Sequence, residues 1–143
     1  MLITPHFTLE ELITSQVAAR EGLDNQPTPA AMGNLRLLCQ ALEQVRALFG
    51  RPIIINSGYR SAAVNARVGG SATSQHLRGL AADFTVVGVS CRDVVKAVSE
   101  SDLAFDQLIL EYDRWVHLSI VPTGARRQVL TLRAGTGYLP GLQ

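Results

Sequence analysis

The spacing of apolar residues predicts two helices in the first third of the chain. Thr8 and Glu11 are placed as a capping box, with Phe7 and Leu12 as a hydrophobic staple, so a short helix begins there. After the loop GLDNQPTP, Thr28 and Pro29 fit the start of a longer helix, which Gly50 ends. Its apolar positions recur every three or four residues: Met32, Leu35, Leu38, Leu42, Val45 and Leu48.

The remaining two thirds of the chain carry mainly strand patterns. We expect strands at 53–55, 81–87, 107–111, 115–120 and 128–133, a short helix at 62–67 and a helix from Ser90 to about Glu100. The last ten residues, 134–143, look loosely held. Because helices come first and hairpin-connected strands follow, the pattern predicts an α+β fold, with helices packed on a small, mostly antiparallel sheet.

Composition narrows the class of protein. A chain of 143 residues, 47% hydrophobic and 17% charged, suits one compact domain over residues 1–143. The net charge of +1 gives no support for a nucleic-acid partner. No run approaches the roughly 18 apolar residues of a membrane span, and MLITPHFTLEELITS lacks the features of a signal peptide. We therefore expect a cytoplasmic protein, unless another agent releases it.

The two cysteines, Cys39 and Cys91, are interpreted as buried thiols, with a disulfide left open. A lone pair without a CxxC motif makes a cysteine zinc site a poor hypothesis.

Strand parity turns two polar residues away from the core, because alternate residues of a strand face opposite sides. In WVHLSI, the apolar set is Val116, Leu118 and Ile120, so His117 lies on the other face. In LAADFTV, the apolar set at 82, 84 and 86 turns Asp83 outward, and a buried aspartate needs a partner or a metal. His6 has no polar company and is interpreted as a surface or structural residue.

The hairpin between 106 and 120 has two possible registers. A two-residue turn at Asp113-Arg114 would put Glu111 on the core side. A three-residue loop from Tyr112 to Arg114 pairs Glu111 with Trp115, and only this register keeps both faces consistent. Glu111 then lies diagonally from His117 at about 7 Å.

His76, Asp83 and His117 can therefore converge, with Glu111 beside them. Two imidazoles and one carboxylate leave a fourth position open, which is the composition of a catalytic zinc site, although iron(II) uses the same ligand types. The alternative is a His76 that caps a helix, a paired Asp83 and a solvated His117.

Three segments resemble one family of enzymes. SQHLRGLAAD (74–83) is similar to the signature of the zinc D-alanyl-D-alanine carboxypeptidases and L-alanyl-D-glutamate endopeptidases. SGYRS (57–61) resembles their substrate-arginine segment and WVH (115–117) their second histidine segment. The similarity covers most of residues 7–120, and the branch it resembles most includes phage and prophage cell-wall hydrolases.

The resemblance implies one Zn²⁺ held by His76, Asp83 and His117. It implies that Arg60 contacts a substrate carboxylate or the polarised carbonyl and that Ser74 lines the site. Gly79 and Ala81 would allow the two ligand-bearing segments to approach closely. The implied activity is hydrolysis of peptidoglycan stem peptides, as an endopeptidase or a D,D-carboxypeptidase acting on the cell wall after release. We expect the chain to act as a monomer.

One position departs from the family pattern. Many members carry an acidic general base three residues before the second histidine, where this chain has Arg114, which cannot accept a proton. Glu111 and Asp113 are the available replacements, and the register favours Glu111. The alternative function is a non-catalytic wall-binding or phage structural module that keeps the metal-peptidase fold. Arg126, Arg127 and Arg133 could face an anionic wall or form a solvated strand edge.

Overall fold

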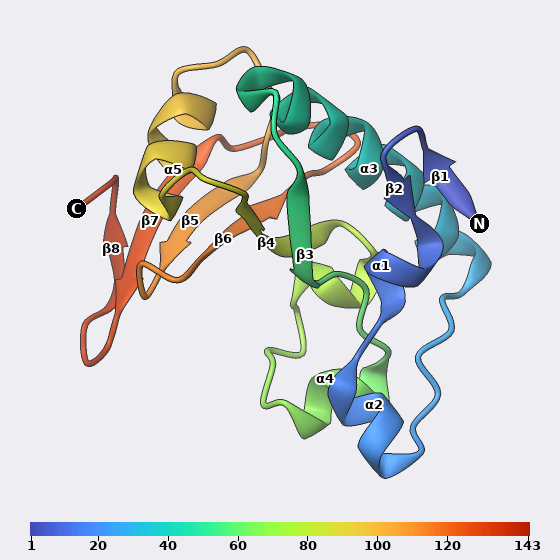
Figure 1. Cartoon of the computed structure of the whole chain (residues 1–143). Helices are drawn as coiled ribbons and strands as arrows, with labels where there is room; N and C mark the ends of the chain where they lie inside the picture. The colour runs from blue at the N-terminus through green and yellow to red at the C-terminus, as the bar shows by residue number, and fades with distance from the viewer.

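The computed structural model describes residues 1–143 (Figure 1). The helices are α1 (Leu9–Ile13), α2 (Gln16–Glu21), α3 (Pro29–Phe49), α4 (Ala62–Arg67) and α5 (Cys91–Ser99), with a 3₁₀ helix η1 (Gln75–Arg78). The strands are β1 (Leu2–Thr4), β2 (Phe7–Thr8), β3 (Ile53–Ser57), β4 (Ala81–Val86), β5 (Gln107–Glu111), β6 (Trp115–Ser119), β7 (Gln128–Arg133) and β8 (Gly137–Pro140). No helix is both long and apolar enough to span a membrane.

Six strands form one sheet in the order β3-β4-β6-β5-β7-β8. All neighbouring pairs are antiparallel except β5 and β7, which run parallel. The predicted α+β fold with a mostly antiparallel sheet is therefore confirmed. Strands β1 and β2 form a separate two-stranded sheet near the N-terminus.

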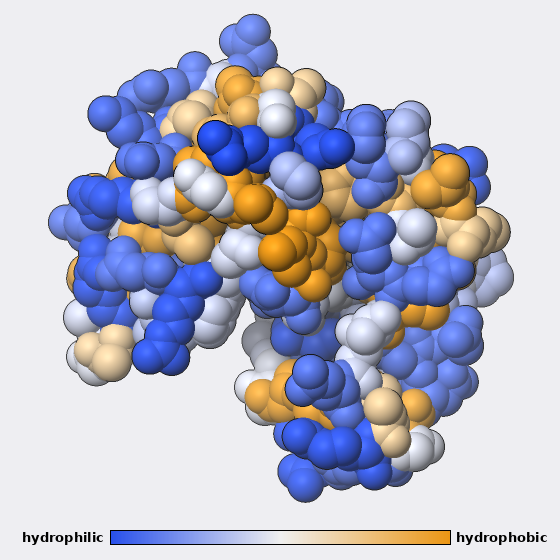
Figure 2. Space-filling view, in the orientation of Figure 1, coloured by the Kyte–Doolittle hydropathy of each residue, from blue (hydrophilic) through white to orange (hydrophobic).

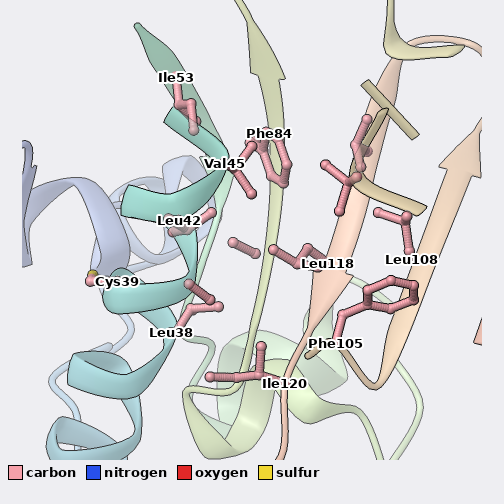
Figure 3. Packing of buried hydrophobic residues seen from close by; sticks show 14 of the residues in the cluster. Leu38, Cys39, Leu42, Val45, Ile53, Phe84, Phe105, Leu108, Leu118 and Ile120 are labelled. Atoms are coloured by element: carbon pink, nitrogen blue, oxygen red, sulfur yellow. The ribbon is translucent and has the colours of Figure 1, made fainter. Parts of the chain in front are cut away.

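Helices α3 and α5 cover one face of the main sheet, and the hydrophobic core lies between them and the strands (Figures 1 and 3). Leu38 and Leu42 on α3 are completely buried, as are Phe84 on β4 and Leu118 on β6. The apolar residues that strand parity predicted to face inward, at 82, 84 and 86 and at 116, 118 and 120, belong to this core. The opposite face of the same sheet is consequently left for polar side chains.

Several short elements were missed from the sequence. Helix α2 has no apolar repeat and is defined by its ends, an N-cap at Ser15 and a left-handed C-cap at Gly22. Strand β8 lies among the residues that we expected to be loosely held, and it pairs with β7 from Leu130↔Pro140 to Arg133↔Gly137. Between Gly137 and Gly141, β8 offers only Tyr138 and Leu139 as apolar side chains before Pro140. This segment is too short to show the alternation of apolar and polar residues that predicts a strand.

Both cysteines are free. Cys39, on the buried side of α3, belongs to the core, and burial raises the pKa of its thiol to about 12. Cys91, the first residue of α5, is only partly buried, so the prediction of two buried thiols holds for Cys39 alone.

Candidate metal centre

Strands β4 and β6 bring two of the predicted ligands side by side. Asp83 and His117 are directly paired in the antiparallel register, so both side chains leave the sheet on the face away from the core. His76 comes from η1, which leads through Gly79 into β4. Two consecutive elements, η1 and β4, and the distant strand β6 thus supply one cluster.

The three side chains are in direct contact. Asp83 Oδ1 lies 2.9 Å from His117 Nδ1, and Asp83 Oδ2 lies 3.3 Å from His76 Nε2. One potential ligand atom from each residue lies within 4.8 Å of the others. The side chain of His76 is 3% exposed, and those of Asp83 and His117 are 14% and 13% exposed. The cluster is therefore nearly buried, with one open side.

A backbone carbonyl fixes the ring of His76. Its Nδ1 lies 2.7 Å from the carbonyl oxygen of Gly58, so an Nδ1–H donates there and the ring presents Nε2 to Asp83. Gly58 itself lies against α1, where an added Cβ would be 2.4 Å from the carbonyl oxygen of Leu12. A glycine is therefore required at position 58 for the chain to hold this carbonyl in place.

The charge on Asp83 is stabilised by its neighbours. Burial opposes ionisation, but the hydrogen bonds of His117 and His76 hold the pKa of Asp83 well below its usual value. An anionic carboxylate between two imidazoles is a ready metal-ligand set. Two nitrogens and one oxygen with an open side match the three protein ligands of a catalytic zinc ion, so the residues fit this metal.

The cluster lies in the largest cleft of the molecule, with a volume of about 970 Å³. The space-filling view shows the molecule hollowed between the side that carries β7 and β8 and the lobe that carries α2 and α4 (Figure 2). Most residues that line the cleft are polar, and Arg60, Ser74 and Glu111 are among them. The sequence-predicted site residues, apart from Asp113, are therefore brought together.

Glu111 reaches the cleft through the predicted register of the hairpin. Glu111 pairs with Trp115 and Ile109 with His117, which confirms the three-residue loop. Trp115 Nε1 donates a hydrogen bond to Glu111 Oε2 at 2.9 Å. Burial, together with the negative charge of Asp83, raises the pKa of Glu111. Glu111 is thus a carboxyl group with a raised pKa in the same cleft as the candidate metal ligands.

Asp113 and Arg114 lie outside the cleft. Both line a separate shallow depression beside Tyr112, and the carboxylate of Asp113 forms an ion pair with Arg133. The loop bends sharply because Tyr112 and Asp113 adopt left-handed backbone conformations, with φ of 57° and 56°. This tight loop places Arg114, where an acidic general base was expected, away from the candidate metal ligands.

Arg60 borders the cleft from the segment between β3 and α4. Its Nη2 lies 3.3 Å from Ser74 Oγ, and its buried Nε has no hydrogen-bond partner in the chain. Burial lowers the pKa of Arg60, although the negative charges of Asp83 and Glu111 oppose this shift. A partly desolvated guanidinium on the cleft wall is suited to binding a substrate oxygen.

Sequence reasoning missed a polar network that ties the cleft together. Asp106 is buried and accepts bonds from Arg126 Nε at 2.9 Å and Nη2 at 2.7 Å, and from Gln75 Nε2 at 3.1 Å. This anchors η1, the start of β5 and the segment before β7 to one carboxylate. No motif in the sequence pointed to it, because the three residues meet only in the folded chain.

Gly79, the three arginines and His6 lie outside the metal cluster. Gly79 adopts a left-handed conformation (φ 74°), but an added Cβ there would lie 2.8 Å from the carbonyl oxygen of Ala31 on α3, so the close approach is to α3 rather than to the second ligand segment. Arg126 pairs with Asp106, Arg127 lies over the ring of Phe105 and Arg133 pairs with Asp113. All three arginines are therefore engaged within the chain. His6 lies near the surface, as expected, but it does have a polar partner, because its Nδ1 lies 2.7 Å from a carboxylate oxygen of Glu43.

The fold and the site together define a candidate catalytic metal centre: three ligands, an open side, and a carboxylate and an arginine in the same cleft. Residues 5–119 match the model of the Peptidase M15 family, and the chain belongs to this family of zinc-dependent metallopeptidases. A comparison with curated proteins found no match.

Proposed function

We propose that the protein is a zinc-dependent peptidase that hydrolyses a peptide bond in the stem peptides of peptidoglycan. The convergence of His76, Asp83 and His117 beside Glu111 in one open cleft is the observation that carries this proposal. Family membership supports peptide-bond hydrolysis. The resemblance of residues 57–61 and 74–83 to peptidoglycan peptidases supports the substrate class.

His76, Asp83 and His117 would hold the zinc ion. When bound, zinc supplies a Lewis acid that polarises a carbonyl group and lowers the pKa of water toward about 7. Glu111 accepts a proton from the attacking water and passes it to the leaving amine. Its raised pKa suits both steps, since a group that ionises closer to neutrality both accepts and returns a proton readily.

Arg60 supplies positive charge on the cleft wall. Its guanidinium binds either a carboxylate of the substrate or the oxygen that becomes negative as water adds to the carbonyl. Ser74 holds the guanidinium through the 3.3 Å contact between its hydroxyl and Nη2. The partly buried position strengthens either interaction, because the local dielectric is lower than in water.

Two specificities use the same centre. An endopeptidase cuts within the stem peptide, whereas a D,D-carboxypeptidase removes its terminal D-alanine. We propose that the protein acts on the cell wall after release from the cytoplasm, in the manner of a phage or prophage lysin. The products identify the bond and hence the specificity.

Digestion of purified peptidoglycan, followed by mass spectrometry of the muropeptides, tests the proposal. We expect wild-type protein with one bound zinc to generate new peptide termini, and Glu111→Gln to generate very few. The peptidase proposal would be wrong if the protein bound one zinc per chain but cut no bond under conditions in which a known lysin cuts. That result would favour the non-catalytic wall-binding module.

A further inference from the structure

One wall of the cleft lies outside the residues that match the family model. The match ends at residue 119, whereas β7 and β8 cover Gln128–Arg133 and Gly137–Pro140. These strands and the segment before them contribute Arg126, Gln128, Leu130, Tyr138 and Pro140 to the lining. Family membership thus accounts for the metal ligands but not for this wall.

The sheet register places Tyr138 on the same face and in the same row as the catalytic carboxylate. Trp115 pairs with Glu111, Glu111 with Leu132, and Leu132 with Tyr138 across β6, β5, β7 and β8. Two strand spacings, about 10 Å, therefore separate the backbones of Glu111 and Tyr138. This corresponds to about three residues of an extended peptide.

The hydroxyl of Tyr138 is available to a ligand. The residue is 59% exposed, it lines the cleft, and its hydroxyl has no hydrogen-bond partner within the chain. Partial burial and the negative charges of Glu111 and Asp83 raise the pKa of Tyr138. The phenol therefore keeps its proton and presents a neutral hydrogen-bond donor.

The order of the strands gives the cleft a direction. Arg60 follows β3 at one edge of the sheet, the metal ligands lie on and next to β4 and β6, Glu111 lies on β5, and Tyr138 lies on β8 at the other edge. A peptide that runs across this face from Arg60 to Tyr138 must pass over the metal ligands. A peptide main chain offers a carbonyl acceptor at each residue, which a phenol donor suits.

We propose that Tyr138 is a substrate-binding residue, whose hydroxyl donates a hydrogen bond to the peptide main chain about three residues beyond the point where the peptide passes Glu111. The inference rests on the proposed function and adds a subsite formed by β7 and β8. Because Tyr138 lies beyond the reacting bond, its hydrogen bond forms equally in the ground state and the transition state, and it affects binding rather than turnover.

Tyr138→Phe tests this directly, because it removes the hydroxyl and keeps the ring on β8. The matched control is Tyr112→Phe, since Tyr112 is also exposed but lines the separate depression beside Asp113. Peptide binding can be followed by the fluorescence of Trp115, the single tryptophan, which lies in the cleft. The titrant is a soluble stem peptide, and hydrolysis of the same peptide gives kcat and KM.

We expect Tyr138→Phe to raise both Kd and KM about fivefold with kcat unchanged, whereas Tyr112→Phe matches wild type. Equal Kd and KM in wild type and Tyr138→Phe would overturn the inference while leaving the peptidase intact. A fall in kcat without a change in KM would also overturn it, because it would place the hydroxyl at the reacting carbonyl. A wild-type protein that binds but does not cut removes the proposed activity, and the Kd comparison still decides the role of Tyr138. A wild-type protein that does neither overturns both proposals.

Discussion

The indole N–H of Trp115 donates a hydrogen bond to Glu111 across the β5–β6 hairpin, with Nε1 and Oε2 2.9 Å apart. The two residues are directly paired in the sheet, two positions from the pair of Ile109 with the candidate ligand His117. This bond holds the carboxylate on the cleft side of the sheet. It also favours the ionised form of Glu111, opposing the raised pKa that burial causes.

The first prediction concerns the general base. We expect Glu111→Gln to lower kcat by at least about 100-fold, because an amide cannot accept the proton. Asp113→Asn should keep nearly full activity, since Asp113 lies outside the cleft and pairs with Arg133. Both variants should bind one zinc ion, measured by atomic emission. Full activity of Glu111→Gln together with loss in Asp113→Asn would refute our assignment of the base.

The second prediction concerns the donor that holds this base. Trp115→Phe removes the N–H, so the pKa of Glu111 should rise further. A base works when deprotonated, and activity falls as the pH drops through its pKa. The acidic limb of the kcat/KM profile should therefore move to higher pH, with a loss of about tenfold at the optimum. Unchanged zinc content is the control, and an unshifted limb would contradict the role of Trp115.

The third prediction concerns the metal. Wild-type protein should bind one zinc ion, and zinc should raise its melting temperature, because only the folded chain assembles the three ligands. His76→Ala should lose this stabilisation. The matched control is His6→Ala, which removes a surface histidine paired with Glu43 and should bind zinc normally. Equal zinc affinity in His76→Ala and wild type would rule out the assigned site.

The fourth prediction concerns acid stability. The bidentate bond from Arg126 lowers the pKa of Asp106 from its usual 3.8. A lowered pKa means that the stabilisation is fully present above 3.8 and is lost as the pH falls through the value in the folded protein. Asp106→Asn should therefore be less stable than wild type at pH 7, and the difference should shrink below pH 3.8. Urea unfolding at several pH values measures this, and a constant difference would be the contrary result.

The fifth prediction concerns the carbonyl that orients His76. In Gly58→Ala the new Cβ would lie 2.4 Å from the carbonyl oxygen of Leu12, so the backbone must move. We expect a loss of about 3 kcal/mol in the free energy of unfolding and weaker zinc binding. Gly33→Ala on α3 is the control, because its Cβ meets nothing within 4 Å and should stabilise the helix by about 0.5–1 kcal/mol. Equal stability of the two variants would contradict the packing argument.

The sequence by itself determined the elements whose signals are local. The cap at Thr28, the apolar repeat of α3 and the stop at Gly50 define one helix without reference to the rest of the chain. Parity and hairpin register are also local, because a shift of one residue would move His117 and Glu111 to the core face. The side of the sheet for Asp83, His117 and Glu111 was therefore predictable.

Only the tertiary structure decided what meets across long separations. No short stretch of sequence predicted three features of the cleft. They are the wall built by β7 and β8, the carbonyl of Gly58 behind His76 and the bonds from Arg126 to Asp106. Each depends on side-chain directions and on the parallel pairing of β5 with β7, which no turn motif specifies. The candidate metal ligands could be predicted from the sequence, while the shape of the cleft around them follows from packing the whole chain.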